Sequence, residues 1–182
     1  MQIIETGFEG LYIIQPKIFT DERGYFFESY KLETFLKAGI PFNPVQDNES
    51  KSSRGVIRGL HYQLEPFAQA KLIRVVTGRI YDVAVDLRKH SRTYGKWYGI
   101  ELDSENKTQF FIPKGFAHGF SVLSDTAIIQ YKCDNLYSPV HERGIDLNDP
   151  FLKIDWKIND LKPVISNKDR KHPKFADADN NY

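Results

Sequence analysis

A histidine in a short basic segment is the feature of the sequence with the clearest chemical potential. The segment Arg54–Gln63 contains two arginines and His61. An imidazole titrates near neutral pH and can serve as a general base, while the planar guanidinium of Arg58 presents paired donors to phosphate oxygens. These residue types together fit proton transfer on a phosphorylated substrate. The plainer interpretation, a solvated basic face of a strand, stays open at this point.

Groups that would complete an acid–base site lie further along the chain. Lys71 and Arg74 follow the histidine segment and add positive charge that suits a diphosphate. Asp169 is a candidate partner for His61, because a carboxylate on one ring nitrogen fixes the tautomer and stabilises the charged ring. The same residue has a second interpretation, since Ser166-Asn167-Lys168-Asp169 matches a helix capping box in type and spacing.

The phase of the histidine segment decides which of its side chains share a face. In a regular strand His61 and Gln63 point one way and Arg58 points the other, because the side-chain period is two. A β-bulge at Gly55 or Gly59 would change this phase.

A second motif, Pro113-x-Gly115-x-x-His118, resembles the second sequence motif of cupins, whose histidine binds a metal ion in many members. Metal-binding cupins also carry two imidazoles at positions i and i+2 of their first motif, since that spacing places both on one strand face. Here the corresponding triplet is His61-Tyr62-Gln63, so the second imidazole is missing. The sequence therefore predicts no metal ion.

Two tyrosines are further candidates. Tyr131 and Tyr137 would share a strand face if no turn lies between them. A tyrosine hydroxyl in a desolvated pocket can return a proton to a carbanion, whereas a tyrosine elsewhere packs or stacks. We interpret Trp156 as a core residue.

Short apolar runs separated by turn residues must carry these side chains. Their spacing of roughly 8–12 residues indicates a sandwich or barrel and not βαβ units. Strands are predicted at 11–14, 72–76, 79–87, 97–102, 108–112, 120–123 and 127–132. Thr77-Gly78 predicts a hairpin turn. A helix is expected at Lys31–Ala38 with Gly39 as its cap, and a second short helix near Ser166.

The composition is that of an ordinary globular protein. The 182 residues are 41% apolar and 27% charged, and a net charge of +1 creates no field that favours nucleic acid or a membrane surface. Cys133 is the single cysteine, so an intrachain disulfide is excluded. No apolar run approaches the roughly 18 residues of a membrane span, and no signal peptide is evident. We expect a cytoplasmic protein with one domain, 1–182, whose polar tail at 177–182 frays.

Taken in order, these segments resemble the dTDP-4-dehydrorhamnose 3,5-epimerases along nearly the whole chain. The resemblance rests on Asp21–Tyr30, Gln46–Asn48, Arg54–Gln63, Ala68–Leu72, Tyr81–Arg88, Pro113–Phe120, Tyr131-Lys132, Tyr137–Pro139, Glu142–Ile145, Ile154–Trp156 and Ser166–Asp169. It implies an all-β, cupin-type jelly-roll sandwich or barrel with a few short helices. It also implies epimerisation at C3 and C5 of dTDP-4-keto-6-deoxy-D-glucose, giving dTDP-4-keto-L-rhamnose, without a cofactor.

The resemblance also implies roles for individual residues. The base falls on His61, its carboxylate partner on Asp169, the proton donor on Tyr131 and the lysine near the enolate on Lys71. Tyr137 falls on the position that stacks on thymine. The remaining contacts with the nucleotide and phosphates fall on Arg23, Glu28, Gln46, Asn48, Arg58, His118, Glu142 and Lys168.

The resemblance further implies a homodimer in which the Arg23–Glu28 segment enters the partner's site. Several alternatives stay open: an epimerase of C3 alone or of C5 alone, a 3,4-ketoisomerase, a metal-dependent cupin enzyme, and a sugar-binding cupin without catalysis. Tyr131 argues against the ketoisomerase, and the missing second imidazole argues against the metal enzyme.

Overall fold

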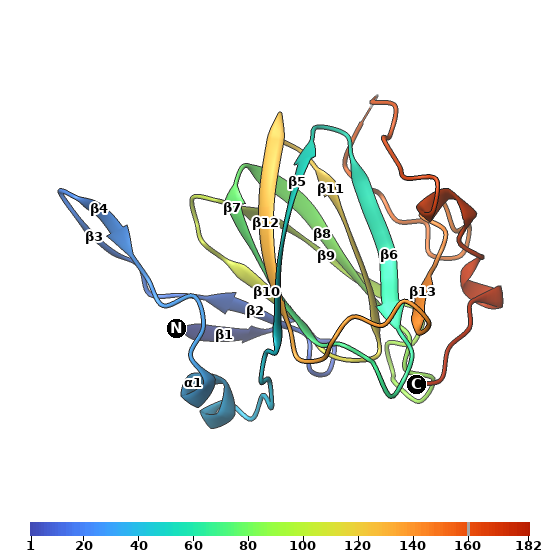
Figure 1. Cartoon of the computed structure of the whole chain (residues 1–182), viewed down its shortest axis with the longest axis horizontal. Coiled ribbons are helices and arrows are strands. Elements are labelled where there is room, and N and C mark those ends of the chain that lie inside the picture. Colours follow the sequence, from blue (N-terminus) through green and yellow to red (C-terminus); the bar gives the residue numbers. More distant parts are fainter. Residues whose placement is uncertain (160) are drawn as a thin grey trace.

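Two antiparallel sheets packed face to face form the body of the protein (Figure 1). The computed structural model describes residues 1–159 and 161–182. The first sheet has the order β1 (Gln2–Glu5), β2 (Tyr12–Gln15), β10 (Gln109–Ile112), β7 (Lys71–Thr77), β12 (Thr126–Cys133) and β5 (Gln46–Ser53). The second has the order β13 (Glu142–Gly144), β6 (Ile57–Gln63), β11 (Phe116–Val122), β8 (Arg79–Asp86) and β9 (Trp97–Asp103). The predicted all-β, cupin-type sandwich is confirmed.

The second sheet is buried on both faces. Its inner face packs on the first sheet through residues such as Ile80 and Ala84, which share a cluster with Ile73. Its outer face carries Val83 and packs on the C-terminal segment that follows β13, through residues such as Trp156. This explains why β8 is buried along nearly its whole length, and it confirms Trp156 as a core residue.

The described residues contain one α-helix, α1 (Leu32–Lys37), which packs on the outer face of the first sheet. Its Phe35 is fully buried against Phe42 and Phe111. Gly39 follows the helix with φ of 75°, the left-handed conformation that ends many helices. The second predicted helix is present as a short 3₁₀ turn, η1 (Asp169–Lys171), followed by another, η2 (Phe175–Asp177). No helix in the described part of the chain is long and apolar enough to cross a membrane.

The predicted hairpin at Thr77-Gly78 is wrong, although the turn itself is present. β7 and β8 lie in different sheets, so the turn carries the chain across the sandwich. Gly78 has φ of 82°, and a Cβ there would lie 2.1 Å from the carbonyl oxygen of Thr126. The alternating pattern predicts two strands, but their hydrogen-bonding partners come from distant parts of the chain.

The C-terminal tail is also ordered where the sequence predicts fraying. The hydroxyl of Tyr182 donates to the Gln63 carbonyl, and that of Tyr62 donates to the Asp179 carbonyl at 2.5 Å. The side chain of Asn180 adds a hydrogen bond of 2.6 Å to a backbone carbonyl after β8. Polar groups of the tail thus form hydrogen bonds with groups of the sandwich and not only with water.

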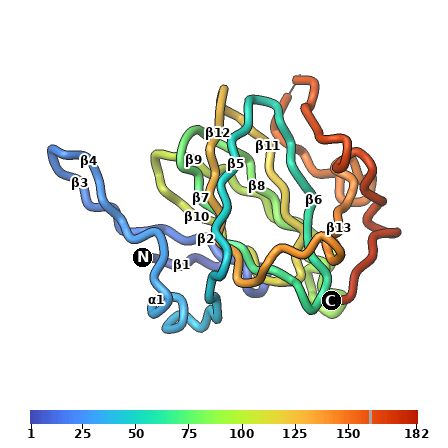
Figure 2. Tube along the Cα trace, in the orientation of Figure 1, coloured from blue at the N-terminus to red at the C-terminus, as the bar shows by residue number. Residues whose placement is uncertain are grey.

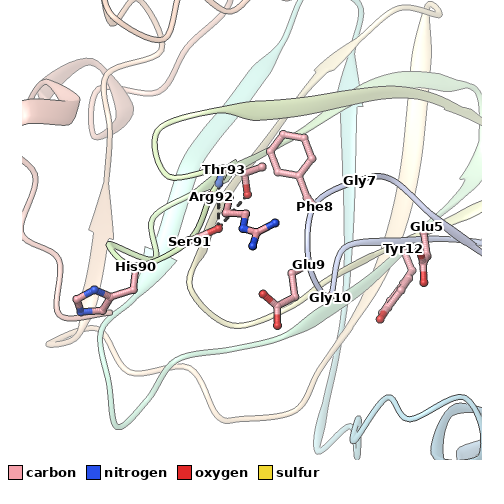
Figure 3. A pocket seen from close by; sticks show the side chains of 10 residues that line it. All are labelled: Glu5, Gly7, Phe8, Glu9, Gly10, Tyr12, His90, Ser91, Arg92 and Thr93. Carbon is pink, nitrogen blue, oxygen red and sulfur yellow. Dashed lines mark hydrogen bonds between the residues drawn. The ribbon is translucent and has the colours of Figure 1, made fainter.

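A buried carboxylate organises the loop that follows β8. Asp86 accepts hydrogen bonds from the Arg88 guanidinium at 2.9 and 2.8 Å and from the hydroxyls of Ser91 and Thr93 at 2.6 Å each. Burial disfavours its charge, yet these donors hold the pKa of Asp86 below its ordinary value. Ser91 and Thr93 line a cavity of about 570 Å³ between this loop and the turn that carries Glu9. Figure 3 labels these residues.

We expect Asp86→Asn to lower the free energy of unfolding by about 3 kcal/mol at pH 7, because the Arg88 guanidinium loses its buried counter-charge. The folded-state pKa of Asp86 is lowered, so its stabilising contribution is complete above the unfolded pKa of about 4 and is lost as pH falls through the folded pKa. The difference from wild type should therefore shrink below about pH 4.

Urea unfolding at pH 7, 5 and 3.5 measures this difference. Asp125→Asn is the matched control, because the carboxylate of Asp125 is 97% exposed and its loss should leave stability unchanged. A difference that stays constant over this pH range would contradict the role assigned to the Asp86 carboxylate.

Candidate active site

A cavity of about 570 Å³ lies between the two sheets. Seven predicted site residues line it: Arg58, His61, Lys71, His118, Tyr131, Lys168 and Asp169. An adjoining hollow of about 250 Å³ shares His61, Lys71 and Tyr131 with it. Four more predicted residues line this second hollow: Gln46, Asn48, Tyr137 and Glu142. The fold therefore gathers eleven of the thirteen predicted residues, counted from these two sets, around two adjoining hollows.

His61 and Asp169 form a hydrogen-bonded pair, with Nε2 of the imidazole 2.9 Å from Oδ1 of the carboxylate. The other carboxylate oxygen accepts the backbone N–H of Gly59 at 3.3 Å. Burial opposes the charge of Asp169, but hydrogen bonding to His61 and the Gly59 amide keeps its pKa below the ordinary value. An ionised carboxylate only accepts, so Nε2 carries the proton and Nδ1 of His61 is the basic nitrogen.

Only half of the predicted capping box forms around Asp169. Its backbone N–H donates to Oγ of Ser166 at 3.0 Å, as the motif predicts. Its carboxylate does not return to the start of the turn but reaches β6, more than a hundred residues earlier in the chain. The structural and the functional interpretations of this residue are therefore compatible.

A β-bulge brings Arg58 and His61 to the same cavity. His61 pairs with His118 and Arg58 pairs with Phe120. An interval of three residues on β6 therefore lies opposite an interval of two residues on β11, which defines the bulge. Gly59 lies inside the bulge with φ of 130°, and a Cβ there would lie 2.5 Å from a Cα of β11. Simple alternation, which places Arg58 and His61 on opposite faces, is therefore wrong here, and the phase shift considered at Gly59 is present.

Lys71 and Tyr131 come from the opposite wall, on β7 and β12 of the first sheet. Burial lowers the pKa of Lys71, with nearby acidic groups including Asp82 and Glu142 acting against it. Burial also raises the pKa of Tyr131, so this phenol keeps its proton at neutral pH. The cavity thus presents a lysine whose charged form a nearby anion would favour and a phenol that retains its proton.

Arg74 does not join this group. It lies three residues after Lys71 on β7 and points to the other face of the sheet, where its guanidinium donates to Oε1 of Gln130 at 2.5 Å. The predicted basic cluster therefore contains Lys71 but not Arg74.

A second histidine–aspartate pair lies on the same wall as the first. Nε2 of His118 is 2.7 Å from Oδ1 of Asp82, and both residues are buried. The other oxygen, Oδ2 of Asp82, has no partner among the described residues. Sequence reasoning missed Asp82, although a carboxylate inside the apolar run of β8 signals a buried partner.

Tyr137 and Tyr131 do not share a strand face, because β12 ends at Cys133 and a turn intervenes. They line the same hollow all the same. The hydroxyl of Tyr137 donates to Oε2 of Glu142 at 2.6 Å, and this bond raises the pKa of Tyr137 to about 12. Lys168 donates to the same oxygen. Burial opposes the charge of Glu142, but these two donors hold its pKa below the ordinary value.

Gln63 holds the loop that carries Tyr137. Its amide donates to the carbonyls of Phe67 at 2.6 Å and Leu136 at 3.2 Å, and its oxygen accepts the backbone N–H of Ser138 at 2.6 Å. Gln63 stands where metal-binding cupins carry their second imidazole, and here it orders a loop instead. Nothing in the sequence pattern distinguishes this role.

One set of described residues brings together potential metal ligands. Single donor atoms of His61, Asp169 and His172 lie within 4.8 Å of one another. Nε2 of His61 and Oδ1 of Asp169 already bind each other, so an ion there would have to displace this hydrogen bond. The absence of a metal ion stays a prediction.

Arg23 and Glu28 are the two predicted residues that this cavity does not gather. Arg23 lies at the turn between β3 (Phe19–Asp21) and β4 (Gly24–Phe26), a hairpin that projects from the sandwich (Figures 1 and 2). Its side chain is 85% exposed and binds Asp21 of the same hairpin. Glu28 is exposed as well.

Comparison with known proteins identifies the family of this chain. The family model described as dTDP-4-dehydrorhamnose 3,5-epimerase matches residues 5–177. The chain belongs to this family. A dTDP-4-dehydrorhamnose 3,5-epimerase from Shigella flexneri is 52% identical over 180 residues, which cover 98% of this chain and 98% of that protein.

Solved structures of similar proteins carry the same fold. A dTDP-6-deoxy-D-glucose-3,5-epimerase from Legionella pneumophila Philadelphia 1, in complex with dTDP-4-keto-L-rhamnose, is 48% identical with a TM-score of 0.91 over 95% of this chain and 92% of that one. ChmJ, a 3′-monoepimerase from Streptomyces bikiniensis in complex with dTDP-quinovose, is 35% identical with a TM-score of 0.89 over 95% and 87%. The family fold thus accommodates both double and single epimerisation.

We expect Gln63→Leu to loosen the loop that carries Tyr137, because the Ser138 N–H loses its acceptor. Hydrogen exchange at that amide should accelerate about fivefold, the equivalent of about 1 kcal/mol for one hydrogen bond. Gln69→Leu is the control, since the side chain of Gln69 binds the Asn135 carbonyl at 2.7 Å and makes no other hydrogen bond among the described residues. This variant should leave the Ser138 amide protected. Equal exchange at Ser138 in Gln63→Leu and wild type would refute the assignment.

Proposed function

We propose that the protein epimerises C3 and C5 of dTDP-4-keto-6-deoxy-D-glucose and forms dTDP-4-keto-L-rhamnose through enolate intermediates, with no metal or redox cofactor. The observation that carries this proposal is the placement of the His61–Asp169 pair on one wall of the cavity and Tyr131 on the other. Inversion of a carbon centre needs a base on one face of the sugar and an acid on the opposite face. The two sheets of the sandwich supply these two faces.

The chemistry follows from the C4 ketone, which acidifies the hydrogens at C3 and C5. Nδ1 of His61 takes the proton, and the electrons of the broken C–H bond move into the enolate. Lys71 stabilises the developing negative charge on O4. The O–H of Tyr131 then protonates the carbon from the other side. Positioned acid–base catalysis of this kind contributes on the order of 10²- to 10⁴-fold, and no hydride changes hands.

The remaining cavity residues suit the nucleotide diphosphate. Arg58, Lys168 and His118 offer cationic or hydrogen-bonding groups to phosphate oxygens. The ring of Tyr137, half exposed at the outer hollow, is available to stack on the thymine. Gln46 and Asn48 line the same hollow and provide amide groups beside it.

A homodimer with shared sites is part of this proposal. Arg23 and Glu28 do not reach the cavity of their own chain. The hairpin that carries Arg23 also exposes large apolar side chains, including Phe26, which is 66% exposed. Exposed apolar area of this kind marks an interface. Docking this hairpin on a second copy would cover it and deliver Arg23 to the other site.

Proton NMR with dTDP-4-keto-6-deoxy-D-glucose in deuterated water tests the reaction. The wild type should introduce deuterium at both C3 and C5. Deuterium at one carbon alone would indicate a monoepimerase, the activity of the ChmJ relative, and no exchange would refute the proposal.

Two variants separate the steps in the same experiment. His61→Ala should lose exchange by at least about 10²-fold while it still binds dTDP. Tyr131→Phe should retain deuterium exchange more than it retains inversion, because only the proton donor is removed. Turnover of His61→Ala near the wild-type rate, or full inversion by Tyr131→Phe, would overturn these roles.

Complementation tests the shared site. Arg23→Ala and His61→Ala should each have low activity, for different reasons. In an equimolar exchanged mixture half of the dimers are mixed, and each mixed dimer has one intact site, so activity should recover to about a quarter of wild type. A mixture no more active than its components would contradict a site built from two chains.

A further inference from the structure

A second imidazole packs against the ring of His61. The ring centroids of His61 and His172 are 5.4 Å apart and the ring planes meet at 86°, an edge-to-face contact. Nδ1 of His172 is buried and has no hydrogen-bond partner among the described residues. An unpaired buried nitrogen costs free energy. His172 lines neither hollow of the cavity, so any influence on the reaction would act through His61.

One turn of the chain delivers both groups that contact His61. Asp169 begins the 3₁₀ turn η1 and His172 follows its last residue. Side chains three residues apart are eclipsed in a 3₁₀ helix, so the carboxylate and the second ring reach His61 from the same side of this turn. The carboxylate fixes Nε2 of His61, and the ring of His172 limits rotation of the imidazole.

The strand beside β6 leaves space for the ring of His172. Gly144 on β13 is the register partner of His61 on β6. A Cβ at Gly144 would lie 2.2 Å from Cε1 and 2.3 Å from Nδ1 of His172. A side chain at position 144 would therefore push the ring of His172 away from its place beside His61.

The charges around His172 favour its neutral form. Burial and the charge of His61 lower its pKa, with Lys168 acting in the same direction and Asp169 and Glu142 acting against it. A neutral ring does not repel the imidazolium that His61 becomes after it takes a proton.

We propose that His172 is a positioning residue for the base: its ring confines the His61 imidazole to the orientation in which Nε2 binds Asp169 and Nδ1 faces the substrate. The effect of His172 on the reaction rate rests on the proposed function. If His61 is the base, an imidazole that rotates away from Asp169 removes protons less often. A misplacement of about 1 Å at a reacting group lowers a rate by up to roughly 10²-fold.

Two substitutions at His172 test the proposal. His172→Ala opens space beside His61 and should lower kcat by roughly ten- to a hundredfold, with KM within about twofold because no cavity wall changes. Deuterium exchange and inversion should fall together, in contrast to Tyr131→Phe. His172→Phe refills the space with a ring that cannot titrate and should restore kcat to within about threefold of wild type.

A readout without substrate keeps this test separate from the proposed function. The downfield proton resonance of the hydrogen-bonded Nε2 of His61 should be sharp in wild type and in His172→Phe, and broadened or lost in His172→Ala. If the wild type does not turn over the sugar nucleotide, the proposed function fails while this resonance still decides the inference. An unchanged resonance in His172→Ala, a kcat within twofold of wild type, or a folded His172→Phe as impaired as His172→Ala would overturn it.

Discussion

A β-bulge in β6 releases the backbone N–H of Gly59 from the sheet and turns it toward the carboxylate of Asp169. The close approach of β6 to β11 permits this, because neither Gly59 nor Gly119 has a side chain at the crossing. The same bulge shifts the phase of the strand, so that Arg58 and His61 both enter the cavity. The roles that we propose for Arg58 in anion binding and for His61 in proton abstraction therefore both depend on one local backbone irregularity.

Asp169 reaches the bulge because the C-terminal segment that follows β13 packs on the outer face of the second sheet. Trp156 anchors this segment in the outer cluster, and the docked tail adds hydrogen bonds at Gln63 and at the end of β8. The 3₁₀ turn that carries Asp169 lies within this covering layer. The position of the Asp169 carboxylate beside His61 therefore depends on the packing of this layer.

Burial acts on the cavity residues in a way that suits their separate tasks. It lowers the pKa of Lys71 and raises that of Tyr131, whereas donors at Asp169 overcome burial and preserve a carboxylate. The cavity therefore holds a carboxylate, a phenol that retains its proton and a lysine whose charged form is favoured when an anion forms nearby. Such preorganised groups stabilise a developing enolate more strongly than water does.

The sequence by itself determines most of the secondary-structure elements and the residue types of the candidate site. Alternating apolar runs predict most strands, and the cap at Gly39 predicts the end of the helix, because these signals depend on neighbours within a few residues. The family resemblance identifies His61, Lys71, Tyr131 and Asp169 as candidate catalytic residues. Each of these predictions can be made without knowing which residues lie next to one another in the folded protein.

Tertiary structure alone decides how those pieces meet. The polar strand β5 has no apolar pattern and is a strand because β12 pairs with it along its length. The turn at Gly78 connects strands of two different sheets and does not form a hairpin. Arg74 faces away from the cavity, and the C-terminal tail packs on the sandwich. Asp82, Gln63 and His172 owe their roles to contacts across large sequence separations. Local periodicity carries no information about which distant segment supplies a partner, so these features follow only from the packed fold.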